Sequence, residues 1–236
     1  MVLFTASRDI QCYLCAMNKA IHLFVYLLRL DIKNQSALAG VLLFGLSSIY
    51  SAYLMNPSVL DGQFLITFWL LAILFASFYT IQKEDGGQNK GGQLFLYTMV
   101  SPRMYISVKS IYTGFFLVAV NLLQWGLLLF FFGSDWIIQN NAGLVIWAIV
   151  LISFALGITL SFVHGISIKT RQPGGILAIL GFATLIPILF SAVILMKTLT
   201  LTPNSGEVDW GWMLISMMIL LPFALSNVLY PYLWRD

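Results

Sequence analysis

Six long apolar stretches, none of which contains Asp, Glu, Lys, Arg or His, dominate this chain of 236 residues. Each stretch is close to the roughly 20 residues that a helix needs to cross a bilayer core of about 30 Å. Strands of this length would leave backbone groups unpaired in lipid, so we expect helices. The predicted spans are Ala37–Leu54, Phe64–Ile81, Ile111–Phe132, Ala142–Val163, Gly175–Met196 and Trp210–Leu229. The expected fold class is an all-α integral membrane protein with six transmembrane helices.

The composition excludes a soluble globular domain. Hydrophobic residues make up 60% of the chain and charged residues only 9%. Nine acidic and 12 basic side chains cannot cover the surface of a soluble protein of this size. The net charge of +3 reflects membrane topology and does not indicate nucleic-acid binding.

The basic residues are distributed unevenly between the two sides of the predicted membrane. Eleven of the 12 Lys and Arg lie in segments that would share one side, and only Lys197 lies on the other. Retention of positive charge in the cytoplasm predicts that both termini are cytoplasmic. The outer segments 55–63 and 133–141 agree with this orientation, because they contain Asp61 and Asp135 but no Lys or Arg.

The first 16 residues do not have the apolar core of a signal peptide, and we expect Met17 to be the biological start. Cys12 and Cys15 are the only two cysteines. A structural disulfide is not expected in the cytoplasm. One Cys-x-x-Cys pair supplies only half of the ligands that zinc requires, and Ala16 stands where a haem-attachment motif needs His.

A helix with one polar face is predicted before the first span. Its polar positions are spaced three, four, three and four residues apart, which places them on one side of a helix. They are Lys19, His22, Tyr26, Arg29 and Lys33. We expect this helix, at about 19–33, to lie in the cytoplasmic membrane interface. Residues 1–36 form the cytoplasmic N-terminus, and 37–236 form the membrane domain.

The predicted spans lack the ionisable residues that proton-coupled pumps and ion carriers keep at mid-membrane, so energy for any transport must come from elsewhere. The fourth span has a small residue at every fourth position, a pattern that favours close helix packing over a substrate path. These residues are Ser153, Gly157, Ser161 and Gly165.

Polar residues and prolines mark other positions in the spans. Asn121 and Gln124 are expected to form hydrogen bonds between helices, or else to line a cavity. Pro187 and Pro222 are expected to kink their helices, with gating as the functional alternative. His164 is expected to be an interfacial histidine, and a haem ligand is the alternative. The deep residues Trp69, Trp125 and Trp147 have no functional interpretation.

The inner loop 82–110 contains the one substantial hydrophilic stretch, residues 82–92, with four glycines. It lacks a nucleotide-binding P-loop, because Lys90 is followed by Gly91 and not by Ser or Thr. The mainly apolar segment 93–100 is too short to span, and we expect Pro102 to end its helix. This helix would dock into a soluble partner or lie on the bilayer surface. Lys109 would mark the return to the membrane.

Three stretches of the chain resemble the heme exporter protein B family, the membrane subunit of the cytochrome c maturation transporter. They are Gly92–Leu94 with Val100–Pro102 and Lys109, Gly165–Lys169 with Gly174–Leu177, and Leu185–Phe190. The order and spacing of these stretches carry the resemblance, which covers about Met17 to Asp236. Residues 1–16 and the glycine-rich stretch 86–92 depart from the family pattern.

The resemblance implies an ABC-2-type permease of the bacterial inner membrane. Its partners would be a cytoplasmic ATPase that binds the ATP (heme exporter protein A), a haem-handling membrane protein (heme exporter protein C) and a periplasmic haem chaperone. Haem could be present in the complex, the chain would bind no nucleic acid, and a homodimer is expected because six helices are half of a usual ABC membrane core. ATPase coupling would involve Gln93, Leu94, Phe95, Tyr97, Ser101, Pro102 and Lys109.

Two further functions stay open on the sequence. One is a generic ABC-2 exporter of a lipid, drug or polysaccharide, and the other is a non-transporting membrane scaffold of a haem-transfer complex. An integral-membrane enzyme is not expected, because no cluster of Asp, Glu, His or Ser lies near the lipid surface. We therefore expect a non-catalytic subunit.

Overall fold

The computed structural model describes residues 20–29, 35–54, 62–87, 101–133, 142–168, 173–201 and 205–233. These residues form seven helices and no strand. The first helix is Ala20–Arg29. It is followed by α2 (Gln35–Leu54), α3 (Gly62–Gly87), α5 (Pro102–Phe132), α6 (Ala142–Ser167), α7 (Pro173–Thr200) and α8 (Ser205–Leu233).

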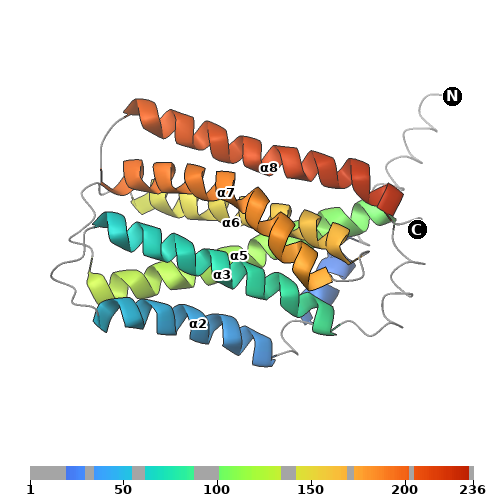
Figure 1. The fold of residues 1–236 in the computed structure, drawn as a ribbon, viewed down its shortest axis with the longest axis horizontal. Coiled ribbons are helices and arrows are strands. Elements are labelled where there is room, and N and C mark those ends of the chain that lie inside the picture. The colour runs from blue at the N-terminus through green and yellow to red at the C-terminus, as the bar shows by residue number, and fades with distance from the viewer. Residues whose placement is uncertain are drawn as a thin grey trace, which may run out of the picture.

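The six long helices run up and down, each antiparallel to the next (Figure 1). One end of the bundle, here called the near end, holds the helix Ala20–Arg29, the start of α2 and the end of α8. The opposite end, here called the far end, holds the ends of α2, α5 and α7 and the starts of α3, α6 and α8. Ala20 and Leu233 therefore lie on the same side of the bundle, as the predicted topology requires.

Five of the helices are long and apolar enough to cross a membrane, so the chain is a multi-pass membrane protein. Their candidate spans are Gly62–Ile81, Arg103–Phe132, Gly143–Ser167, Gly174–Thr200 and Trp210–Leu229. The sixth expected span, Ala37–Leu54, lies in α2, a helix of 20 residues. Its apolar stretch with described side chains, Ala39–Leu54, is shorter than the others.

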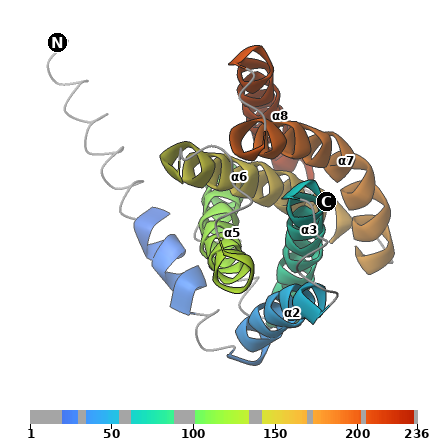
Figure 2. The ribbon, with the colours of Figure 1, turned by 90° about the vertical axis from the view of Figure 1, so that its left-hand side faces the viewer.

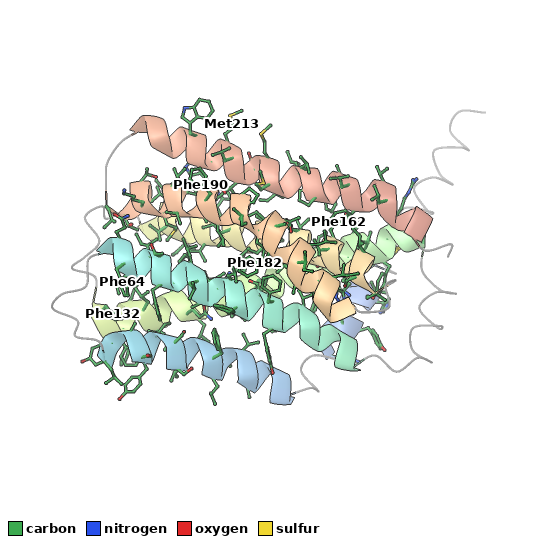
Figure 3. The ribbon with its side chains drawn as sticks, in the orientation of Figure 1. Phe64, Phe132, Phe162, Phe182, Phe190 and Met213 are labelled. Carbon is green, nitrogen blue, oxygen red and sulfur yellow. The ribbon has the colours of Figure 1, made fainter. Side chains whose placement is uncertain are left out.

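The helices differ in how deeply they are buried in the bundle. About two thirds of the span of α3 is buried, against 17% of the span of α8. Figure 2 shows α2 and α8 on opposite sides of the bundle, with α3, α5 and α6 between them. Met213 points away from the bundle on the outer side of α8 (Figure 3), and it is exposed. The outer faces of the peripheral helices are therefore apolar, as contact with lipid requires.

The start of α5 is where the structure departs most from the predicted spans. The helix begins at Pro102 and not at Ile111, and it is 31 residues long. Ser101 has an extended backbone, which a following proline favours, and Pro102 suits the first turn because that position needs no N–H. Pro102 thus opens α5. At 1.5 Å per residue α5 is about 46 Å long, so it extends beyond a bilayer core of about 30 Å.

The helix Ala20–Arg29 packs against this extension of α5. Leu23 and Leu27 are buried in one cluster with Tyr105 and Tyr112, and the ring centroids of Phe24 and Tyr112 lie 5.5 Å apart. The remaining surface divides into two exposed faces. The polar face is His22, Tyr26 and Arg29, and the apolar face is Ile21, Val25 and Leu28. At about 100° per residue, these two faces and the buried face point in directions about 100° to 140° apart.

Candidate functional site

The predicted coupling residues fall into two groups. Gln93, Leu94, Phe95 and Tyr97 lie outside the described residues. Ser101, Pro102 and Lys109 lie in the first turns of α5, at the near end (Figure 1). The segment 88–100 therefore connects the end of α3 to the start of α5, and a force applied there would reach these two helices first.

The backbones of α5 and α6 come close together at two glycines. A Cβ atom built on Gly157 would lie 2.7 Å from both the Cα and the N of Gly114. A Cβ atom on Gly114 would in turn lie 2.6 Å from the ring of Phe154. The two backbones can approach this closely only because both positions are glycine. We refer to Gly114 and Gly157 as the glycine interface.

The other small residues of α6 are also buried. Ser153, Ser161 and Gly165 share with Gly157 one side of α6. Ser153 accepts a hydrogen bond of 2.7 Å from the Nδ2 of Asn121 and donates one of 2.6 Å to the carbonyl of Ile149. The small side chains therefore serve contact between helices along this face of α6.

A different kind of contact joins α2 to α5. A Cβ atom on Gly45 would lie 2.7 Å from Nε2 and 3.1 Å from Cγ of Gln124, so the amide side chain lies directly over the glycine. One turn earlier on α2, a Cβ atom on Gly40 would lie 2.6 Å from the hydroxyl of Tyr79 on α3. Side chains from two helices thus occupy glycine positions of α2. We refer to Gly45 and Gln124 as the amide interface.

Several buried polar atoms in the middle of the bundle have no hydrogen-bond partner among the described residues. Both amide atoms of Gln124 belong to this group, although the residue is only 1% exposed. So do Oδ1 of Asn121 and Nε1 of Trp69. Trp69 packs edge-on against Trp125 with ring centroids 5.0 Å apart. Such groups are costly in lipid and are often found where a protein rearranges or binds a polar group.

The near end contains a buried basic residue that the sequence analysis placed at the membrane surface. Lys109 is 4% exposed and His164 is 1% exposed. The two side chains are close enough to interact electrostatically. The expectation of an interfacial histidine stays a prediction: His164 lies in the last turn of α6, at the end of its candidate span, with its side chain buried in the bundle. The candidate span of α5 begins at Arg103, six residues before Lys109, where the return to the membrane was expected.

The two prolines lie within continuous helices. Pro187 lies inside α7, and α7 changes direction near its middle in Figure 1. A proline is the usual cause of such a bend, because it removes one hydrogen bond of the helix. α8 continues through Pro222 as one helix from Ser205 to Leu233.

The described residues contain no group of three or more His, Cys, Asp or Glu that could hold a metal ion. Trp69, Asn121 and Gln124 each have a buried polar atom without a hydrogen-bond partner among the described residues. The sequence predicted only part of this group. The two amides were recognised from their rarity in lipid, whereas the indole was not. No pattern along α5 could indicate Trp69, because this residue lies on α3 and meets Trp125 only through the arrangement of the helices.

Comparison with known proteins gives no match from which an activity could be inferred. No protein-family model matches the chain, and neither does any curated protein or solved structure.

Proposed function

We propose that the chain is the permease subunit of an ABC-type complex, moved by a cytoplasmic ATPase, and that the complex serves haem delivery in cytochrome c maturation. The observation that supports an ATPase-driven permease is the composition of the candidate spans. The five candidate spans contain no Asp or Glu. Proton-coupled and sodium-coupled carriers use such carboxylates to bind the driving ion. A bundle without them needs an external source of energy.

The position of α5 supports transmission from the near end. α5 contacts α2, α3, α6 and α8. It also contacts the helix Ala20–Arg29. A displacement of the segment 88–100 would move the start of α5. Because α5 contacts four other long helices, its movement would reach all of them. In this proposal the glycine interface keeps α5 and α6 together, while the amide interface allows α2 to shift.

The three faces of Ala20–Arg29 support its placement in the cytoplasmic membrane interface. Its buried face is held by α5, its apolar face suits the acyl boundary, and its polar face suits headgroups and water. In the proposed orientation the near end is cytoplasmic and the membrane is the bacterial inner membrane.

The assignment to haem delivery rests on the sequence resemblance to the heme exporter protein B family. Haem would reach apocytochrome c through a periplasmic chaperone, and the ATPase would drive release of the loaded chaperone. The chain would act with heme exporter proteins A and C, and a pair of copies would form the membrane core.

The decisive experiment removes the chain from a cell that makes both b-type and c-type cytochromes. Covalent c-type cytochromes should disappear, as measured by haem staining of denaturing gels, while b-type cytochromes persist. Normal c-type levels would contradict the haem assignment and leave a generic exporter as the better hypothesis.

A second experiment tests the ATPase contact separately. The substitutions Leu94→Asp and Tyr97→Asp should abolish co-purification with the ATPase, because a charge in an apolar docking segment opposes burial. Asn89→Asp, in the glycine-rich part of the same loop, is the matched control and should leave recovery unchanged. Full recovery of the ATPase with both segment variants would contradict the coupling assignment.

Orientation can be tested with single cysteines. In a background with Cys12→Ser and Cys15→Ser, the variants Asp61→Cys and Asp135→Cys should react with an impermeant maleimide from the periplasmic side. Labelling that requires access from the cytoplasm would reverse the orientation.

A further inference from the structure

A pocket at the far end contains the one basic residue that the charge bias leaves unexplained. The pocket has a volume of about 320 Å³ and is lined by Ile194, Lys197, Thr198 and Trp210. The first three residues are in the last turns of α7, and Trp210 is near the start of α8. The volume of the pocket lies at the lower end of the range for small-ligand sites.

The pocket lies at the ends of two candidate spans, so we expect it at the depth of the lipid headgroups. Lys197 is three residues before the end of the span Gly174–Thr200, and Trp210 is the first residue of the span Trp210–Leu229. Tryptophan is enriched at this depth because its ring is apolar and its N–H is polar. Trp210 is 66% exposed, so its ring is available to a ligand.

In the predicted topology Lys197 is the one basic residue, among 12, on this side of the membrane. Retention of basic residues in the cytoplasm gives no reason for a lysine here. A lysine at a helix C-terminus also stabilises the helix dipole. That role alone does not require an adjoining pocket with an exposed indole.

We propose that this pocket binds the phosphate of an anionic phospholipid in the leaflet at the far end. Lys197 provides the positive charge for the phosphate, and Trp210 and Ile194 contact the glycerol and the upper acyl chain. The hydroxyl of Thr198 already donates to the carbonyls of Ile194 and Leu195, at 3.0 Å each, so the ammonium group is the charged donor of the site.

The test uses the full chain in nanodiscs that contain brominated phosphatidylglycerol or brominated phosphatidylcholine. Bromine quenches a nearby indole, and subtraction of the emission of Trp210→Phe isolates the contribution of Trp210. Phosphatidylglycerol should occupy the pocket with about a fivefold preference, the size expected for one basic residue near a charged membrane surface. Lys197→Gln should remove this preference.

Arg103→Gln is the matched control, because it removes the same charge from an exposed position at the near end. It should leave the preference at Trp210 unchanged. In the wild-type protein the preference should weaken at high salt, since screening acts on charge and not on acyl-chain contact. This measurement needs no variant and so does not depend on the folding of Lys197→Gln.

Four results would overturn the proposal. The first is equal quenching of wild-type Trp210 by the two lipids. The second is an unchanged preference in Lys197→Gln, and the third is a preference that salt does not weaken. The fourth is loss of the preference on addition of inorganic phosphate, which would identify a soluble anion as the ligand.

Discussion

α5 makes two contacts that differ in what fills the space between the helices. At the glycine interface the backbone of α6 meets the backbone of α5, and nothing there can move independently of a helix. At the amide interface the flexible side chain of Gln124 lies between α5 and Gly45 of α2, and its polar atoms have no partner among the described residues. The glycine interface is therefore rigid. The amide interface can adapt, and its buried amide lacks hydrogen-bond partners among the described residues. A membrane protein without acidic residues in its candidate spans can still divide into fixed and movable parts in this way.

The largest expected effect comes from filling the glycine interface. Gly157→Ala should lower the free energy of unfolding by about 3 kcal/mol, because the new methyl group meets backbone atoms that can yield only if a whole helix moves. Unfolding in mixed micelles, followed by circular dichroism, measures this change. Gly126→Ala on α5 is the control, since a Cβ atom there has no neighbour within 4 Å. A small effect at Gly157 would show that the two helices are not closely packed in the membrane.

A change of opposite sign is expected at the amide interface. Gln124→Met should raise the free energy of unfolding by about 1–2 kcal/mol, because it removes a buried amide without a partner and keeps the length of the side chain. The same unfolding assay measures the gain. Gln63→Met, at an exposed position at the start of α3, should change stability by less than about 0.5 kcal/mol. Destabilisation by Gln124→Met would mean that the amide has a partner in the membrane.

Gly45→Ala compares the two interfaces directly. Its expected cost is about 1 kcal/mol, less than at Gly157, because the side chain of Gln124 can move aside. The cost should vanish when Gln124→Ala is combined with it, and a double-mutant cycle measures this coupling. Purely additive effects would contradict the contact between the two residues.

The smallest expected effect concerns the hydrogen bond between Asn121 and Ser153. Ser153→Ala should lower stability by about 0.6 kcal/mol, the average for side-chain hydrogen bonds between transmembrane helices. Ser216→Ala is the matched control, because the exposed Ser216 donates only to the carbonyl of Met213 in its own helix. Equal losses in the two variants would show that the bond to Asn121 contributes nothing.

Much of the fold could be predicted from apolar length alone. Five expected spans were found because a bilayer imposes one length on every helix that crosses it. The start of α5 lies upstream of the expected span, which began at Ile111 because Lys109 was interpreted as the return to the membrane. The buried positions Ile106, Ser110, Thr113 and Leu117 recur every three or four residues, and this periodicity could have extended the helix upstream.

The site was less predictable than the fold. Spacing identified the small residues of α6, since a repeat of four needs no knowledge of the partner helix. The same reasoning could not find Gly45 against Gln124, because contacts between α2 and α5 depend on how the helices are arranged in space. The pocket beside Lys197 was missed for the same reason, although the sequence had already shown that this lysine is unusual.

The packing of Ala20–Arg29 has a mechanical consequence. Its leucines are fixed to the tyrosines of α5, while its apolar face points toward the acyl boundary in the proposed orientation. Any change in lateral pressure or curvature of that leaflet would act on this short helix, and α5 would receive the strain. The lipid around the bundle would then set the resting tension against which a cytoplasmic motor works.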